Sequence, residues 1–273
     1  MSAARRRARP VAIAALAALT LGAPLLVPAS DVDPLRQNGP AFAPPSLEHP
    51  LGTDENGVSV LAQVVHATPA SLLVGLAATA AAVAIGAVAG ILGGYLPRAP
   101  AAVLNRLTLG FLVLPQVPFA VAVGAVLPRG TVTLIVAVAL TSWATVARTV
   151  RAGVEAVLVR PHVERVRALG AGHLHQLRAH VVPAVLPLLS AAASLTVANA
   201  LLAEATLAFL GIGDPTAVSW GTMLRRAAAA GAATAGAWWC LLTPGIAMVA
   251  AVLAFGAGAR AAERRHTPAR GRT

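Results

Sequence analysis

The stretch PHVERVRALGAGHLHQLRAHVVP, residues 161–183, is a polar island inside an apolar chain. It holds three arginines, four histidines and one glutamate, whereas alanine, valine, leucine and glycine dominate on either side. Pro161 suits the first turn of a helix, where its missing N–H costs nothing. Gly170 and Gly172 supply the permissive backbone angles that end one short helix and start another. The stretch therefore predicts two short helices joined by a glycine bend.

The two predicted helices form a compact knob that suits docking into a groove on a soluble partner. Glu164 lies early in the first helix, where a negative charge favours the positive helix end. The second helix is expected from about His173 to Val182, and Pro183 is expected to end it. Three arginines project from the predicted knob: Arg165, Arg167 and Arg178.

The composition indicates a membrane protein. Of 273 residues, 57% are hydrophobic and 11% charged, and the mean hydropathy is +0.74, outside the usual range of soluble domains. The net charge of +11 comes from arginine alone, because the chain has no lysine. These cations lie between apolar runs and not on a polar domain with interleaved aromatic residues, which argues against a nucleic-acid partner. The single cysteine, Cys240, cannot form an intrachain disulfide.

Six stretches approach the roughly 20 apolar residues that a membrane-spanning helix needs. They are Val11–Ala29, Ala70–Leu96, Val103–Leu127, Thr131–Ala147, Val185–Leu210 and Gly236–Gly258. The fold class expected is an all-α membrane protein with six transmembrane helices and the knob between spans 4 and 5. The expected divisions are residues 1–29 (first span with a basic N-terminus), 30–69 (outer loop), 70–258 (core of five spans, with the knob loop at about 155–183) and 259–273 (basic tail).

Arginine placement predicts the orientation, since short cytoplasmic loops carry the excess of positive charge. With both termini in the cytoplasm, all but four of the 21 arginines fall on the cytoplasmic side, including those of the knob. The four left outside are Arg36, Arg129, Arg225 and Arg226. An alternative concerns the N-terminus, which also fits a cleaved secretory signal with Val27 and Ala29 at the cleavage positions. Cleavage would leave five spans in the same orientation.

The sequence lacks the common motifs of ATP hydrolysis, hydrolase catalysis and thiol redox chemistry. A chain without lysine cannot form a P-loop, and no His-Glu-x-x-His, Gly-x-Ser-x-Gly or Cys-x-x-Cys is present. The predicted spans contain a single acid, Glu204, whereas self-powered transporters usually carry several intramembrane ionisable groups. We therefore expect neither an enzyme nor a self-sufficient carrier, and no catalytic, cofactor-binding or metal-ligating residue.

Two features inside the predicted spans stand out. Gly86, Gly90 and Gly94 form a stripe at four-residue spacing that lets a neighbouring helix approach closely, although alanine- and glycine-rich spans also produce such stripes by chance. In the fifth span Thr196, Asn199 and Thr206 fall near one helical face.

Glu204 lies well round from that face, near the outer end of the same span. There it is expected to reach water, or Arg225 or Arg226, at low cost. The sequence nominates Asn199, Glu204 and Thr206 for a translocation path or its gate, and leaves a structural hydrogen-bonding role for Glu204 open.

Several motifs in fixed order resemble the permease subunits of ABC importers, in the dipeptide, oligopeptide and nickel branch. Glu164, Gly170 and Pro183 have the spacing of that family's "EAA" loop, and RALGAGHLHQLRAHVVP is similar to the branch's version of it. The other motifs are HPLGTDENG (49–57), SLLVGL (71–76), LAEATLAFLGIG (202–213), SWGTML (219–224) and WWCLLTPG (238–245). Together they cover about residues 47–255.

The resemblance implies a multi-pass protein of the cytoplasmic membrane with defined partners. These are a homologous permease, forming a heterodimer, two cytoplasmic ATPase subunits that bind ATP and magnesium, an external solute-binding protein, and membrane lipid. It also implies that the knob couples this chain to an ATPase through Glu164, Arg165, Arg167, Ala168, Leu169, Gly170, His180 and Pro183. The chain itself is expected to bind no cofactor.

The chain departs from the family pattern at three places. Arg165 and Val166 replace two alanines after the glutamate, and Val58, Ser59 and Gln63 replace charged residues of the outer loop. The last span also ends without the family's Asn-Leu-Leu-Gly-Asp run. These departures are compatible with lost activity or with compensation by the partner permease.

The function expected from the resemblance is a peptide permease of an ATP-driven importer. The alternatives are a permease for nickel or another small solute, and a non-transporting scaffold or degenerate paralogue. A metal site at His173, His175 and His180 is disfavoured, because these residues lie on the cytoplasmic side, away from any capture site.

Overall fold

The computed structural model describes residues 36–37, 39–214 and 216–266, with side chains described as far as residue 256. The predicted first span at Val11–Ala29 and the alternative signal sequence lie outside these residues. The described secondary structure is helical apart from two isolated β-bridges in the loop before the first described helix. The elements are α2 (Val60–Tyr95), α3 (Arg98–Val113), α4 (Gln116–Val126), α5 (Thr131–Leu158), α6 (Pro161–Ala168), α7 (His173–Gln176), η1 (Leu177–Val181), α8 (Val182–Phe209), α9 (Trp220–Ala229) and α10 (Trp239–His266).

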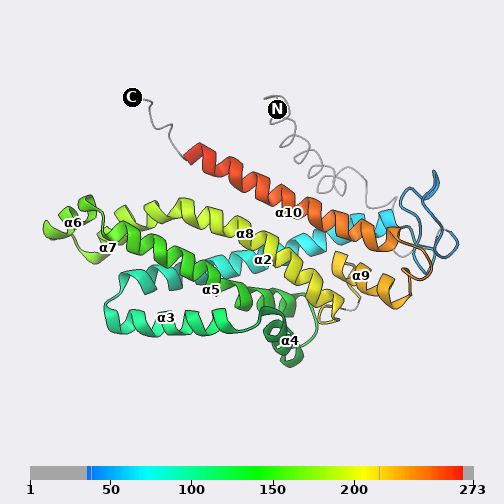
Figure 1. Ribbon diagram of the computed structural model, residues 1–273, viewed down its shortest axis with the longest axis horizontal. Coiled ribbons are helices and arrows are strands. Elements are labelled where there is room, and N and C mark those ends of the chain that lie inside the picture. Colours follow the sequence, from blue (N-terminus) through cyan, green and yellow to red (C-terminus); the bar gives the residue numbers. More distant parts are fainter. Residues whose placement is uncertain (1–35, 38, 215, 267–273) are drawn as a thin grey trace.

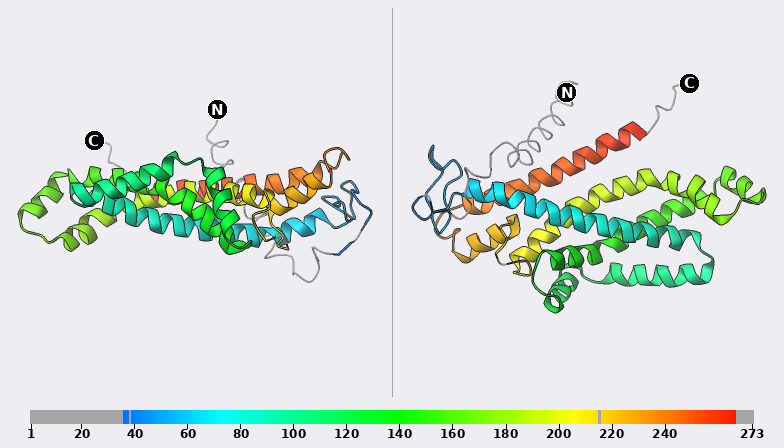
Figure 2. Two further views of the ribbon diagram at one scale, coloured as in Figure 1. Left: turned by 90° about the horizontal axis from the view of Figure 1, so that it is seen from below. Right: turned by 180° about the vertical axis from the view of Figure 1, so that it is seen from behind.

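The helices form an elongated bundle (Figures 1 and 2). Helices α2, α5 and α8 pack on one another in the middle, α3 and α4 lie against α5, and α10 packs on α8 and α9. Helices α6 and α7 project at one end of the bundle, which we call the knob end. Residues 39–59 and α9 lie at the opposite end, which we call the loop end.

Four described helical segments are long and apolar enough to cross a membrane: Val60–Tyr95, Thr131–Leu158, His173–Phe209 and Trp239–Gly256. The predicted third span, Val103–Leu127, is instead two helices, α3 and α4, bent by 97° at a short break. Pro115 lies in this break, where it cannot donate the backbone hydrogen bond that would continue α3. If the bent pair counts as one span, the described residues hold five.

Helices α2 and α5 extend well beyond the predicted spans. Helix α2 begins at Val60, ahead of the expected Ala70, because the Ser59 hydroxyl caps it by accepting the N–H of Ala62 at 3.4 Å. At 36 residues it is about 54 Å long, well beyond the roughly 30 Å of a bilayer core. Helix α5 continues past Ala147 to Leu158, so its last turns carry Arg148 and Arg151.

The prediction that Pro183 ends a separate short helix is wrong. The chain passes from α7 through the π-helical turn η1 into α8 without a break. In that turn the N–H of Val182 donates to the carbonyl of Leu177, five residues back. Pro183 then falls in the first turn of α8, where a missing N–H is tolerated. The second half of the knob is therefore continuous with the membrane helix α8.

The glycine stripe of α2 is a packing surface against α5. A Cβ added at Gly86 would lie 2.6 Å from the carbonyl oxygen of Trp143, and one at Gly90 would lie 2.5 Å from that of Ala147. Backbone contacts this close confirm that the stripe admits a neighbouring helix.

A Gly90→Ala variant is expected to unfold at a temperature several degrees below that of the wild type. Alanine is favoured over glycine in a helix by about 0.5–1 kcal/mol, but the clash with α5 costs about 1–3 kcal/mol. Gly110→Ala on α3 is the matched control, since a Cβ there meets nothing within 4 Å and propensity alone should raise its midpoint. Thermal unfolding of the purified protein in detergent measures both, and equal midpoints would contradict the packing.

Buried valines pack the base of the knob against the bundle. Val163 of α6 and Val181 of η1 are 1% and 0% exposed. They pack into a buried cluster with Val146, Val150, Val154 and Val157 of α5 and Val185 of α8. The knob is therefore part of the folded core at its base, while its tip is left exposed.

Candidate functional site

The first short helix of the knob, α6, begins at Pro161 and ends in a glycine turn. Pro161 opens α6, and Glu164 lies in its first turn, both as predicted. After α6, the N–H of Gly170 donates to the carbonyl of Arg167 and that of Ala171 to Val166, at 3.0 and 3.2 Å. Gly170 has a φ of +80°, so this is a Schellman motif with glycine in the left-handed conformation.

The knob presents most of its predicted docking residues to solvent. Glu164, Arg165, Arg167, Ala168, Leu169 and Gly170 are all exposed, and Pro183 is exposed at the start of α8. Leu169 and Leu174 are 87% and 60% exposed, so two apolar side chains stand on an otherwise polar tip. His180 is partly buried, with its ring centroid 5.7 Å from that of His175 and 6.1 Å from that of His162.

The knob histidines come from α6, α7 and η1. Within the described part of the chain, no three His, Cys, Asp or Glu side chains are arranged to hold a metal ion.

A groove of about 250 Å³ runs along α8 between α4 and α5. Asn199 and Thr206 both line it, as the helical-face argument predicted, together with Leu202. Thr196 does not line it and is buried. Two further polar side chains, Gln116 of α4 and Thr141 of α5, line the groove, and the rest of its lining is apolar. The groove thus offers amide and hydroxyl groups without a charged side chain among its lining residues.

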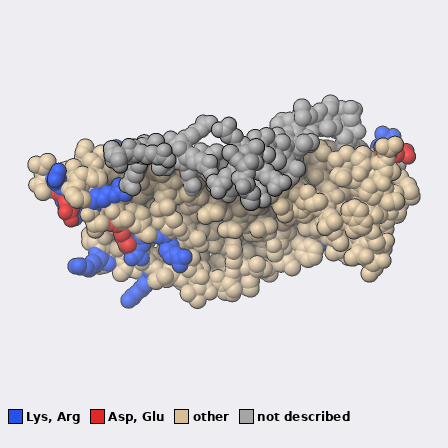
Figure 3. All heavy atoms as spheres, turned by 45° about the horizontal axis from the view of Figure 1, so that its top comes forward, with Lys and Arg blue, Asp and Glu red and all other residues tan. Residues whose placement is uncertain are grey.

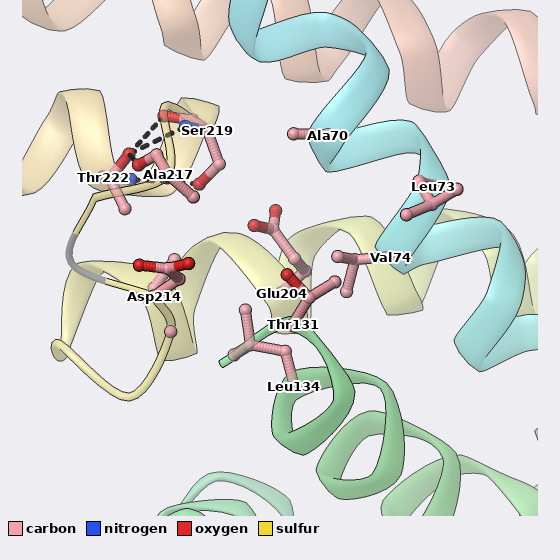
Figure 4. Close-up of a pocket in the computed structure, with 12 residues that line it drawn as sticks. Ala70, Leu73, Val74, Thr131, Leu134, Glu204, Asp214, Ala217, Ser219 and Thr222 are labelled. Carbon is pink, nitrogen blue, oxygen red and sulfur yellow. Dashed lines mark hydrogen bonds between the residues drawn. The ribbon is translucent and has the colours of Figure 1, made fainter. Parts of the chain in front are cut away.

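Glu204 occupies a different place from the groove. It lines a small pocket of about 70 Å³ bounded by α2, α5, α8 and the loop that leads into α9. Figure 4 shows its side chain rising from α8 toward Ser219, with Thr131 and Leu134 of α5 on one side and Asp214 on the other. The sequence nominated Asn199, Glu204 and Thr206 together for a translocation path or its gate. In the structure these residues belong to two sites on opposite sides of α8.

The expectation that Glu204 reaches water or an arginine is wrong. Its side chain is 1% exposed, and neither Arg225 nor Arg226 lines its pocket. The hydroxyls of Ser71 and Ser219 lie near the carboxyl group, although neither forms a hydrogen bond of ordinary geometry with it. Arg226 lines a separate small cavity with Asp54 and Glu55.

Helix ends surround the Glu204 carboxylate. Thr131 is the first residue of α5, and Ser219 and Thr222 form the capping box of α9, with Ser219 Oγ accepting the N–H of Thr222 and Thr222 Oγ1 accepting that of Ser219. The N-terminal end of a helix carries a partial positive charge. Two such ends therefore line the pocket that holds the buried acid.

Asp214 lines the same pocket from the loop between α8 and α9. The hydroxyl and backbone N–H of Thr216 donate to its Oδ1 at 2.6 and 2.8 Å. These bonds hold the pKa of Asp214 below its ordinary value, so its carboxylate stays ionised at neutral pH.

At the loop end, the residues that depart from the family pattern have structural partners. Val58 is buried, Ser59 caps α2, and the Gln63 amide donates to Asp54 Oδ2 at 2.6 Å. Trp239 Nε1 donates to the carbonyl of Thr53 at 3.0 Å, which ties the start of α10 to this loop. The substituted residues are thus integrated into the fold.

The sequence reading missed four polar residues of these sites. Gln116 and Thr141 of the groove carry no periodic signal that links them to α8. Ser71, beside Glu204, and Tyr95, whose hydroxyl lies 3.0 Å from His173 Nδ1 in the knob, acquire their contacts only from residues far along the chain. For Ser219 the available signal was its residue type, since serine is among the preferred N-cap residues of a helix.

Charged side chains mark the two ends of the molecule. On the face shown in Figure 3, arginines and acids gather at the knob end and a few stand at the loop end, with an uncharged zone between them. Together with the long apolar helices, this defines a multi-pass helical membrane protein with a groove along one span that four polar side chains help to line.

The chain belongs to the family described as binding-protein-dependent transport system inner membrane components, which residues 63–268 match. It is 36% identical over 206 residues to the di/tripeptide transport system permease protein DppC of Pseudomonas aeruginosa (strain UCBPP-PA14), covering 75% of this chain and 67% of that protein. It is a multi-pass protein of the cytoplasmic membrane.

Solved structures confirm the fold. The chain is similar to a chain of the MetNI methionine ABC transporter in an inward-facing conformation, with a TM-score of 0.64 and 19% identity, over 76% of this chain and 97% of that one. It is also similar to a chain of an amino acid ABC transporter, with a TM-score of 0.54 and 20% identity, over 72% and 94%. The fold is thus that of ABC-transporter membrane subunits.

Proposed function

We propose that this chain is the permease subunit of an ATP-driven importer for di- and oligopeptides. The groove along α8 carries the proposal, because Gln116, Thr141, Asn199 and Thr206 line it with neutral hydrogen-bonding groups. Such groups suit the amides that all peptides share and do not select one side chain. The name of the Pseudomonas relative supports the same substrate class.

A homologous permease completes the path in this proposal. Leu195, Asn199, Leu202 and Thr206 recur every three or four residues along α8, and all are exposed in the single chain. A volume of about 250 Å³ is below the roughly 300–1,000 Å³ of sites that enclose a small ligand by themselves. A second permease laid on this face would cover the leucines and close the groove.

The knob connects the permease to two ATPase subunits in this proposal, and an external binding protein delivers substrate at the loop end. The knob end then faces the cytoplasm. Leu169 and Leu174 supply apolar contact at the tip, with Glu164, Arg165 and Arg167 around them. ATP and magnesium bind to the partner ATPase, and this permease carries out no hydrolysis.

Uptake of radiolabelled dialanine tests the proposed function. Cells that lack this chain should import dialanine more slowly than cells that carry it, and Asn199→Leu should lower the restored rate by about tenfold, since removing a hydrogen-bonding group from a binding site costs about 1–1.5 kcal/mol.

Ser194→Ala is the control, because the Ser194 hydroxyl bonds only to the carbonyl of Ser190 in its own helix at 3.0 Å. Equal dialanine uptake with and without the chain would refute the peptide assignment. Nickel uptake that depends on the chain would replace it with the metal alternative.

A further inference from the structure

Tyr95 is the last residue of α2 and the chain's single tyrosine. Its hydroxyl lies 3.0 Å from Nδ1 of His173 and 3.3 Å from Oε1 of Gln176. The Tyr95 ring meets the His173 ring edge-on, with centroids 5.9 Å apart. Helix α2 thus ends directly on α7, the second short helix of the knob.

Gln176 extends this contact to the first short helix. Its side chain is 2% exposed, and its Nε2 donates to the carbonyl of Ala171 at 2.7 Å. Ala171 closes the Schellman motif at the end of α6. A single buried amide therefore links Tyr95 to both halves of the knob.

At the loop end, α2 contacts α9. Ser71 Oγ, which is buried, accepts the backbone N–H of Trp220 at 3.1 Å. Between Ser71 and Tyr95, α2 is one continuous helix whose glycine stripe is packed on α5. Movement of one end of such a rod must displace the other end or strain the packing between them.

The knob is connected along the chain to α5 and α8, but not to α2. It follows α5 and continues into α8, whereas His173 is 78 residues from Tyr95 along the chain. Apolar packing of the Tyr95 ring on the valine cluster and its edge-on contact with the His173 ring add to the hydrogen bonds of the hydroxyl.

We propose that Tyr95 is a positioning residue that transmits movement of the knob into α2 and so to α9 at the loop end. This inference rests on the proposed function, in which an ATPase moves the knob. Its consequence is that removing one hydroxyl leaves ATP hydrolysis intact but weakens the response of the loop end to nucleotide.

Cysteine labelling of the ATPase complex tests this directly. In a Cys240→Ser background, Leu61→Cys places the chain's only thiol in the first turn of α2 at the loop end, where Leu61 is 36% exposed. The rate of reaction with a membrane-impermeant maleimide is measured without nucleotide and after trapping with ATP and vanadate. Tyr95→Phe, which keeps the ring, should reduce the nucleotide-induced change in rate about fivefold, the effect of one ordinary hydrogen bond.

Two further variants test whether the hydroxyl acts through His173. His173→Leu removes the ring nitrogen that the Tyr95 hydroxyl meets but leaves the Gln176 contact, so its effect should be the smaller one and should not add fully to that of Tyr95→Phe. Thr149→Val is the control for loss of a hydroxyl, since Thr149 donates only to Thr145 in its own helix; it should behave as the wild type. ATP hydrolysis and complex recovery should stay unchanged in all three.

An unchanged labelling response in Tyr95→Phe would overturn the inference, as would a wild-type rate at position 61 that nucleotide does not alter. If instead the proposed function is wrong, no ATPase would be recovered with the wild-type chain, and this result is distinct from an unchanged labelling response.

Discussion

A Gly170→Pro permease is expected to be recovered without its ATPase and to support no peptide uptake. Gly170 has a φ of +80° and donates its N–H to Arg167. Proline fixes φ near −65° and has no N–H, and a misplaced proline costs about 3 kcal/mol or more. The end of α6 must rearrange, which displaces the exposed surface from Glu164 to Leu169. A loss of that size corresponds to more than about 100-fold in docking affinity.

Gly172→Pro provides a control two residues away. Gly172 has φ −65° and ψ 156°, which proline adopts without strain, and nothing lies within 4 Å of an added Cβ. This variant should retain the ATPase and transport dialanine. The measurement is the amount of ATPase recovered with affinity-tagged permease from solubilised membranes, followed by uptake. If Gly170→Pro retains the ATPase as fully as Gly172→Pro does, the knob is not the docking element.

Features that depend on neighbouring residues could be predicted from the sequence. Pro161 and Gly170 delimit α6 because proline and glycine restrict or free the backbone wherever they occur. The stripe from Gly86 to Gly94 and the face holding Asn199 and Thr206 follow from helical periodicity alone. These local rules predicted the four long apolar helices of the described residues and the first short helix of the knob.

Features that depend on distant contacts could not be predicted. The 97° bend between α3 and α4 depends on how these helices pack against α5 and α8. The π turn that carries the chain past Pro183 is likewise held by Val181 in a cluster contributed mainly by α5. Ser71 meets Trp220 across 149 residues, and no spacing rule reaches that far. Glu204 was noticed because an acid is costly in an apolar span, but its surroundings come from three other elements.

Glu204→Lys is expected to remove the folded protein from the membrane. The carboxylate is 1% exposed and shares its pocket with the N-terminal ends of α5 and α9. Each helix end stabilises a nearby negative charge by about 0.3–1 kcal/mol, and by up to about 2 kcal/mol when partly buried. A lysine would turn both attractions into repulsions, and Asp214 is the one acid left among the residues that line the pocket; losing the compensating interactions of a buried charge costs about 3–5 kcal/mol. That is a large part of the roughly 5–15 kcal/mol that stabilises a typical domain.

The amount of protein in the membrane fraction and the thermal midpoint in detergent measure this effect. Glu155→Lys is the matched charge reversal, since Glu155 is exposed and pairs only with Arg151 on the same helix at 2.7 Å, an interaction worth under about 1 kcal/mol. It should accumulate normally. Glu204→Gln keeps the shape of the side chain and removes its charge, so its midpoint should fall by several degrees if the helix ends hold the carboxylate. A Glu204→Gln midpoint equal to or above that of the wild type would show that shape, and not charge, is what the pocket requires.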